Sequence, residues 1–194
     1  MALWNTRESW GWPARLLHWL IAGLILFQLG VGVYMVEVIG GDLINRFQLT
    51  QTHKSWGVVI FALALLRLVW RALNPRPALP QGMSSMERMA AEGAHIALYA
   101  LMIALPLTGW LMASASPLND PDAYPFQVKN MVFGLFELPD PYQPGDKALS
   151  EQIARFHAGL ALALGALLAV HTGAALKHQF LDRDGLLRRM IVGR

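Results

Sequence analysis

The chain has 194 residues, of which 55% are hydrophobic and only 15% charged, against about 25% charged residues in typical soluble domains. Together with apolar runs that recur along the chain, this composition excludes an ordinary soluble protein and predicts an integral membrane protein. Cysteine is absent, which excludes disulfides, thiolate metal sites, iron–sulfur clusters and covalent haem attachment, and the net charge of +3 is not gathered into a basic, aromatic patch suited to nucleic acid.

Four membrane helices are expected, in a single domain over residues 1–194. The first spans about 15–36 and follows Pro13, which suits a first helical turn. We interpret this helix as retained in the membrane, because no cleavage site of small residues follows a short apolar core. The second helix spans about 53–73, after a connection over 37–52, and its arginines near the end predict an anchor at the membrane interface.

A capping box at Ser84 to Glu87 is expected to start the third helix, whose membrane span covers about 92–113. The fourth is expected over about 153–178, and a basic tail follows it. Between the last two helices, residues 114–152 form a long polar connection. Two interpretations of this connection stay open: a lid with 126–138 as an interfacial segment, or a merely solvated loop.

The distribution of Lys and Arg predicts the orientation of the helices. Eleven of the 16 Lys and Arg residues lie at the two termini, in the loop between helices two and three, and at the adjoining helix ends. Cytoplasmic segments of membrane proteins carry the excess of these residues. The expected fold is therefore an all-α, integral membrane four-helix bundle with both termini in the cytoplasm.

Histidines mark the fourth helix, HAGLALALGALLAVHTGAALKH over residues 157–178. On a helix, His171 lies about 21 Å beyond His157 and about 40° round from it, and His178 follows about 10 Å further on near the same face. Ionisable side chains inside a membrane are costly and usually functional. The spacing therefore indicates a functional histidine constellation.

The predicted topology sorts the six histidines by depth. His53 and His157 begin their helices near the outer face, whereas the remaining four lie towards the inner face: His18, His95, His171 and His178. Two imidazoles facing across a bundle can hold a haem iron from both sides, which favours electron transfer over oxygen binding. Topology alone gives almost no preference between His18 and His95 as the partner of His171.

Two alternatives compete with haem. A zinc or di-iron site is the weaker, because no acid lies in a span beside the histidines except Glu92 at an edge. A proton-relay transporter would also use intramembrane histidines. The broken helices and internal repeat typical of transporters are not evident.

Four segments resemble the bacterial cytochrome b561 family: WPARLLHWL (12–20), THKSWG (52–57), GAHIALYALMIALPLTGWLM (93–112) and HAGLALALGALLAVHTGAALKHQFLDRDGLLRRM (157–190). The resemblance implies a four-helix membrane cytochrome with two non-covalent b haems. It implies that His18 and His171 ligate the inner haem and that His53 and His157 ligate the outer haem.

The same resemblance implies a ubiquinone site near the inner haem, with His178 as the best-matching residue and Arg15 and His95 as further candidates. Some members oxidise superoxide on the periplasmic side, which makes a superoxide:ubiquinone oxidoreductase of the bacterial inner membrane the most concrete expectation. A conduit for a separate dehydrogenase or periplasmic donor is the alternative. Lys54 and Arg155, beside the outer histidines, are expected to steer superoxide or to neutralise haem propionates.

Overall fold

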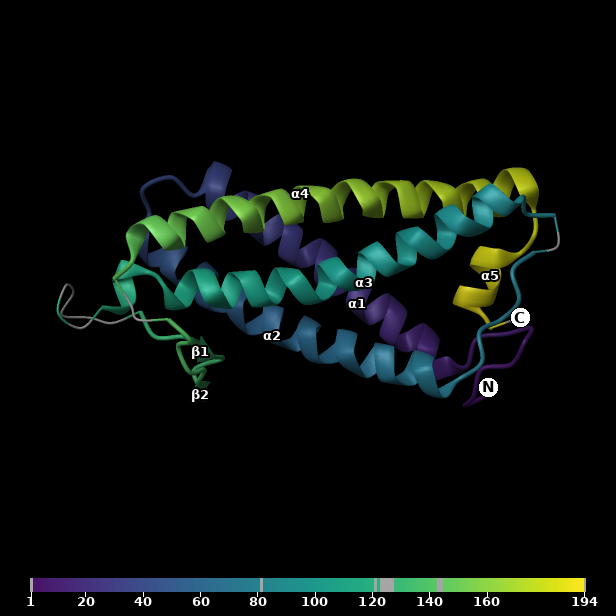
Figure 1. Cartoon of the computed structure of the whole chain (residues 1–194), viewed down its shortest axis with the longest axis horizontal. Helices are drawn as coiled ribbons and strands as arrows, with labels where there is room; N and C mark the ends of the chain where they lie inside the picture. Colours follow the sequence, from purple (N-terminus) through teal and green to yellow (C-terminus); the bar gives the residue numbers. More distant parts are fainter. Residues whose placement is uncertain (1, 81, 121, 123–127, 143–144, 194) are drawn as a thin grey trace. The chain divides into compact units, whose positions relative to one another are not determined.

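In the part of the chain that the structure describes, four helices are long and apolar enough to cross a membrane. The computed structural model describes residues 2–80, 82–120, 122, 128–142 and 145–193. Figure 1 shows the four as its long helical ribbons: α1 Trp12–Val33, α2 Leu43–Leu73, α3 Ser85–Ser114 and α4 Lys147–Lys177. The expected all-α membrane fold is confirmed.

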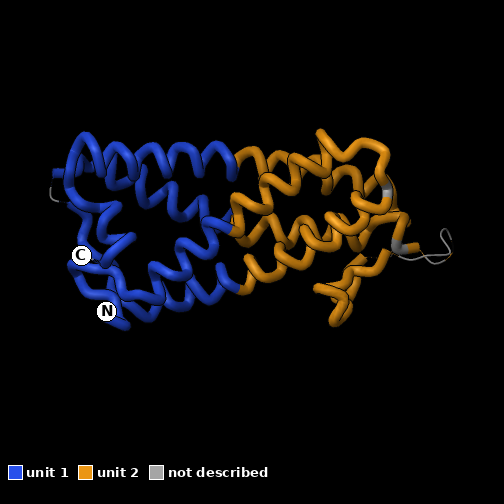
Figure 2. The backbone as a smooth tube through the Cα atoms, turned by 180° about the vertical axis from the view of Figure 1, so that it is seen from behind, with its two compact units in different colours: residues 1–23, 63–101, 164–194 blue, residues 24–62, 102–163 orange. Residues whose placement is uncertain are grey.

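The four long helices contribute to two compact units. Unit 1 comprises 1–23, 63–101 and 164–194, and unit 2 comprises 24–62 and 102–163 (Figure 2). Each of the four helices has residues in both units, so no break in a helix separates the units. Unit 1 contains both chain ends.

Little of the apolar surface of these helices is covered by protein. Only 6% to 17% of the most apolar stretch of each helix is buried inside the molecule. The buried side chains are mainly aliphatic, as Leu17 and Ile21 are in unit 1 and Ile25 and Ile60 are in unit 2. An apolar surface of this extent suits lipid as the solvent, because only burial in hydrocarbon removes it from water.

Helix α2 begins ten residues earlier than expected, so most of the connection predicted over 37–52 is wrong. A π-helical turn, η1 Tyr34–Val38, continues α1. Only residues 39–42 then separate the helices, with Gly40 at φ +55°. Asp42 caps α2, since its carboxylate accepts from the Asn45 backbone N–H at 3.1 Å. The prediction from hydropathy covered only the apolar segment of this helix, 53–73, and did not include its polar first turns.

Helix α3 begins with the predicted capping box. The Ser84 hydroxyl accepts from the Glu87 backbone N–H at 3.2 Å, and Glu87 accepts from the Ser84 backbone N–H at 2.9 Å. Helix α4 begins at Lys147, six residues before the expected 153, because Asp146 caps it by accepting from the Leu149 N–H at 2.9 Å. Both α2 and α4 are thus longer than their apolar segments.

After α4 the helix widens and the chain turns. A π-helical segment, η3 His178–Asp182, follows directly, and the short helix α5 Leu186–Ile191 forms after it. Arg183 at φ +53° and Gly185 at φ +76° make the turn between them. The sequence predicted only a basic tail here, so this return of the chain within unit 1 is a finding of the structure.

The connection between α3 and α4 contains a 3₁₀ turn, η2 Pro117–Asn119, and a small hairpin. Strand β1 Met131–Val132 pairs antiparallel with β2 Phe136–Glu137 (Figure 1). Positive φ at Phe133 and Gly134 supplies the tight turn between them.

The hairpin is fixed to α2, so a merely solvated loop is wrong for residues 128–138. The Phe133 N–H donates to the Ser55 hydroxyl at 2.8 Å, and the Lys54 ammonium donates to the Lys129 carbonyl at 3.1 Å. Trp56 packs edge-on against Phe133, with ring centroids 5.4 Å apart. Residues 126 and 127 of the predicted interfacial segment lie outside the described residues.

Candidate functional site

Three histidines of unit 1 gather in one place, and we call His18, His95 and His171 the first cluster. They come from α1, α3 and α4. The ring centroids of His18 and His171 lie 6.3 Å apart, and those of His95 and His171 lie 5.5 Å apart. The prediction from topology brought the same three residues together.

Unit 2 contains a second meeting of imidazoles, and we call His53 and His157 the second pair. They come from α2 and α4, and their ring centroids lie 6.4 Å apart with ring planes at 76°. His53 lies inside α2 and not at its beginning, because the helix extends beyond the apolar segment. Helix α4 therefore contributes one histidine to each group.

The spacing shows whether a metal ion fits between two such rings. A metal–imidazole bond is about 2.0–2.1 Å long, as in zinc sites, and ring bonds of about 1.3–1.4 Å put the ligating nitrogen about 1.1 Å from the ring centroid. Imidazoles on opposite sides of one ion then have centroids about 6.2–6.4 Å apart. His18 with His171, and the second pair, match this spacing, whereas His95 with His171 is too close.

Small residues leave room beside the second pair. A Cβ on Gly109 would lie 3.4 Å from the His157 ring, and a Cβ on Gly32 would lie 3.8 Å from the His53 ring. A Cβ on Gly159, Gly165 or Gly173 of α4 would meet nothing within 4 Å. Larger side chains at Gly109 or Gly32 would therefore reach the rings of the second pair.

Thr108 of α3 orients His157. The Thr108 hydroxyl lies 2.9 Å from His157 Nδ1 and donates to the carbonyls of Ala104 and Leu105, at 2.9 and 3.0 Å. Because its single hydrogen is directed to a carbonyl, the hydroxyl accepts from His157 Nδ1–H. The Nε2 lone pair of His157 is then free for a metal ion, which is how ligating histidines are normally held.

Arg67 of α2 contacts His18. Its guanidinium donates to the Tyr99 hydroxyl at 3.0 Å, to the Ala14 carbonyl at 2.9 Å and to His18 Nδ1 at 3.3 Å. The side chain of Arg67, which belongs to the predicted interfacial anchor, turns into unit 1 and bonds to α1 and α3. Sequence reasoning missed both Arg67 and Thr108 as partners of the histidines; an arginine inside a membrane span was the available signal.

His53 has an orphaned polar atom. Its Nδ1 is buried and has no hydrogen-bond partner among the described residues. The backbone of His53 is held by Gln28, whose side-chain amide donates to the His53 carbonyl at 2.7 Å. A buried imidazole nitrogen that lacks a partner within the protein is suited to a ligand that supplies one.

His178 lies among acids that were not associated with it from the sequence. It is buried, and its Nδ1 lies 2.7 Å from the Asp184 carboxylate and 3.1 Å from that of Asp182. These three side chains are close enough to share a metal ion, but the Lys177 ammonium lies 2.8 Å from the same Asp182 oxygen. The arrangement is therefore that of an ion-pair network that holds one imidazole in place.

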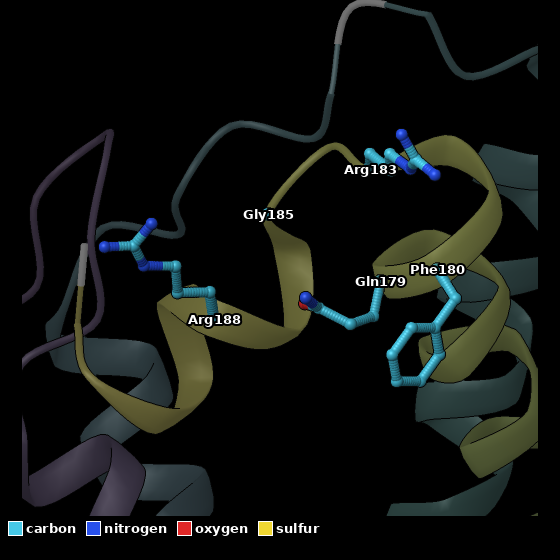
Figure 3. Close-up of a pocket in the computed structure, with 5 residues that line it drawn as sticks. All are labelled: Gln179, Phe180, Arg183, Gly185 and Arg188. Atoms are coloured by element: carbon cyan, nitrogen blue, oxygen red, sulfur yellow. The ribbon is translucent and has the colours of Figure 1, made fainter.

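The other predicted residues of the quinone site also lie in unit 1. Arg15 is buried, and its guanidinium donates to the Ile191 carbonyl at 2.8 Å. Directly after His178 lies an open hollow of about 370 Å³, lined by Gln179, Phe180, Arg183, Gly185 and Arg188. In the view of Figure 3, Arg183 and Arg188 lie on opposite sides of Gly185, and Gln179 extends toward α5.

The two predicted steering cations differ in their surroundings. The Lys54 ammonium donates to the Lys129 carbonyl and to the Asn130 side chain, both at 3.1 Å, and Asn130 in turn bonds to Asp140. Lys54 therefore holds the hairpin beside the second pair. Arg155 is exposed and makes no hydrogen bond or ion pair through its side chain to another described residue.

Comparison with known proteins decides the family. The family model described as prokaryotic cytochrome b561 matches residues 9–193. The chain belongs to the prokaryotic cytochrome b561 family. It is 31% identical to cytochrome b561 homolog 2 of Escherichia coli K12 over 191 residues, which is 98% of this chain and 95% of that protein. It is 27% identical to cytochrome b561 homolog 1 of the same strain over 141 residues, 73% of each chain.

Membership of the cytochrome b561 family makes this chain a multi-pass bacterial membrane protein that transfers electrons and carries b-type haem. Among the described residues, the histidines of unit 1 and unit 2 meet the geometric need for such a group. The transporter alternative is wrong, because the family is one of haem proteins that transfer electrons.

Proposed function

We propose that this cytochrome b561 carries electrons between two b haems, one held by His18 and His171 and the other by His53 and His157, from superoxide to ubiquinone. The observation that carries the proposal is the spacing of 6.3 and 6.4 Å within these two pairs. A haem held by two histidines would supply one-electron transfer without binding a substrate at its iron.

Helix α4, Thr108 and the ring spacings support this assignment of ligands. Helix α4 supplies one ligand to each pair, and these two histidines lie 14 residues apart in the sequence. Thr108 keeps the hydrogen of His157 on Nδ1 and leaves Nε2 available. His95 is the unpaired member of the first cluster and leaves the ligand position to His18, because its ring lies too close to His171.

Ubiquinone would accept electrons beside the first cluster. Its reduction to ubiquinol takes two electrons and two protons. Asp184 holds Nδ1 of His178, so Nε2 is the nitrogen that could face a quinone, and it would donate to a quinone oxygen when both ring nitrogens carry hydrogen. The hollow beside it is lined by an aromatic ring and amide and guanidinium donors, groups that suit a quinone ring and its carbonyls. Arg15 and His95 are the further candidates for this site.

Superoxide would give up its electron at the second pair. Two superoxide anions each lose one electron and become dioxygen, which supplies the two electrons that one ubiquinone takes. Arg155 is an exposed cation two residues before His157 and would attract an anion. Lys54 adds a second charge there while it holds the hairpin. The Lys and Arg bias supports an orientation in which the second pair lies towards the periplasm and both termini lie in the cytoplasm of a bacterium's inner membrane.

The test uses the purified full-length protein with its haem. A pyridine haemochrome assay should give about two b haems per chain, and superoxide should reduce them while added ubiquinone reoxidises them. One haem or none per chain would reject the paired ligation. Two haems that superoxide does not reduce would replace superoxide with a dehydrogenase or a periplasmic protein as the electron donor.

A further inference from the structure

His18 of unit 1 has a charged hydrogen-bond partner, the Arg67 guanidinium, whereas His157 of unit 2 has a neutral one, the Thr108 hydroxyl. We propose that Arg67 and Thr108 order the reduction potentials of the two haems, so that the haem at His18 and His171 has the higher potential. The inference rests on the proposed function, in which each pair holds one haem. According to this inference, these two residues determine which of the two haems an added electron occupies.

Arg67 places a positive charge beside the first cluster that lacks a negative partner. Its three hydrogen bonds all go to neutral groups, which belong to Tyr99, Ala14 and His18. No Asp or Glu of the described residues forms an ion pair with it. Arg71 adds charge of the same sign, since its guanidinium lies 5.5 Å from the centroid of the Tyr99 ring.

This charge favours the reduced state. Reduction adds one electron to the haem, and a fixed cation a few ångströms away stabilises the added charge. The bonds to Tyr99 and Ala14 do not involve His18. They would keep the guanidinium in place when His18 ligates through Nε2 and carries its hydrogen on Nδ1, a state in which Nδ1 no longer accepts from Arg67. Arginine also keeps its charge throughout the physiological pH range, so the effect is permanent.

Thr108 acts in the opposite direction on the second pair. By accepting from Nδ1–H of His157, it increases the electron-donating strength of the other ring nitrogen. A stronger donor stabilises the oxidised state of the metal ion and lowers the reduction potential. No charge is needed for this effect, because the hydroxyl works through the imidazole ring.

Arg155, two residues before His157, is exposed, so water and salt screen its charge. Lys54 is the less exposed cation that could oppose this order, since it follows His53 in the chain. Its ammonium, however, bonds to the side chain of Asn130, and Asn130 bonds to the carboxylate of Asp140. The hairpin thus brings a negative charge close to Lys54. Arg67 has no comparable partner in the part of the chain that the structure describes.

The order of potentials has a chemical consequence. An electron delivered to the haem of the second pair would pass to the haem of the first cluster, so that one haem would lose one electron and the other would gain it, with no proton moved. The electron then rests on the side of His178, where quinone is proposed to bind. Arg67 and Thr108 would be positioning residues for transfer in one direction.

The experiment is a spectroelectrochemical titration of the full-length, haem-loaded protein and four variants. Arg67→Gln should decrease the equilibrium constant for reduction of one haem at least tenfold, which lowers its reduction potential by about 59 mV for one electron. The potential of the other haem should stay unchanged. Arg67→Lys, which keeps the charge, should stay close to wild type. Thr108→Val should raise the potential of the other haem by about threefold to tenfold in the same equilibrium, and Thr108→Ser should restore it.

The haem content of the wild-type protein distinguishes failure of this inference from failure of the proposed function. Two haems in the wild type with unmoved potentials in both Arg67→Gln and Thr108→Val would overturn the inference alone. So would equal shifts of both haems in Arg67→Gln, or a lowered potential in Thr108→Val. Fewer than two haems in the wild type would instead reject the proposed function. If Arg67→Gln loses haem, the comparison of Thr108→Val with Thr108→Ser still tests the order.

Discussion

His53 and His157 face each other in unit 2 with ring centroids 6.4 Å apart. This spacing is nearly that of His18 and His171 in unit 1, at 6.3 Å. In both cases the second member comes from α4, and an ion bound on both sides by imidazole requires about this distance. The likeness of two separately built pairs underlies the first prediction below.

Removal of a ligand should remove one haem at a time. His171→Ala should abolish the haem of the first cluster, and His157→Ala that of the second pair, so each variant should keep about one haem per chain in a pyridine haemochrome assay. His18→Ala should lose the same haem as His171→Ala, and His95→Ala should keep both. Loss of a haem in His95→Ala with two haems left in His18→Ala would reverse the choice of ligand.

Asp184→Asn should slow electron transfer to quinone. The carboxylate holds His178 at 2.7 Å, and an amide would hold it less strongly and carry no charge. Reoxidation of the reduced protein by added ubiquinone should slow by about tenfold, the lower end for lost outer partners of functional histidines. Haem content and spectrum should stay unchanged.

Asp182→Asn is the matched control for the quinone site, since Asp182 is also bonded to Lys177 and lies further from His178, at 3.1 Å. We expect it to slow reoxidation less than Asp184→Asn does. Equal rates in wild type and Asp184→Asn would move the quinone site away from His178, and Arg15→Gln and His95→Ala would then be measured in the same assay.

Arg155→Gln should slow reduction by superoxide if the outer cation steers it. Steered association of charged partners is raised tenfold or more and weakens steeply with salt. The wild-type rate should therefore fall as ionic strength rises, and the variant should show a lower rate and a flatter salt dependence. Lys54→Gln is a poorer test by itself, because it also removes two bonds to the hairpin. A wild-type rate independent of salt would contradict steering.

Ser55→Ala should loosen the hairpin. The hydroxyl of Ser55 is almost fully buried, accepts from the Phe133 N–H at 2.8 Å and donates to the Gln51 carbonyl at 2.8 Å. Its loss leaves the part-buried Phe133 N–H without this partner, which costs at most about 1–3 kcal/mol. Trypsin should then cleave after Lys129 faster in the variant, as followed by mass spectrometry. Thr52→Ala, which removes only a bond to the Gln48 carbonyl within α2, should leave the rate unchanged.

Hydropathy and helical periodicity determined a large part of this protein in advance. Apolar runs long enough to span a membrane predict helices wherever they occur, because lipid offers no partner for an unpaired backbone group. The spacing of His157 and His171 along α4 follows from the helix itself. Helix ends were less predictable, since Asp42 and Asp146 extend α2 and α4 through polar turns that hydropathy does not register.

Only the tertiary structure decided which side chains meet. The choice between His18 and His95 depends on a difference of 0.8 Å in ring spacing, which no pattern within one helix contains. The bonds of Arg67 to His18 and of Thr108 to His157 join residues 49 positions apart in each case, and Asp184 reaches His178 because Arg183 adopts a left-handed conformation that turns the chain back. Such contacts depend on how several helices are rotated and packed against one another, and the apolar pattern that places helices in a membrane is satisfied by many such packings.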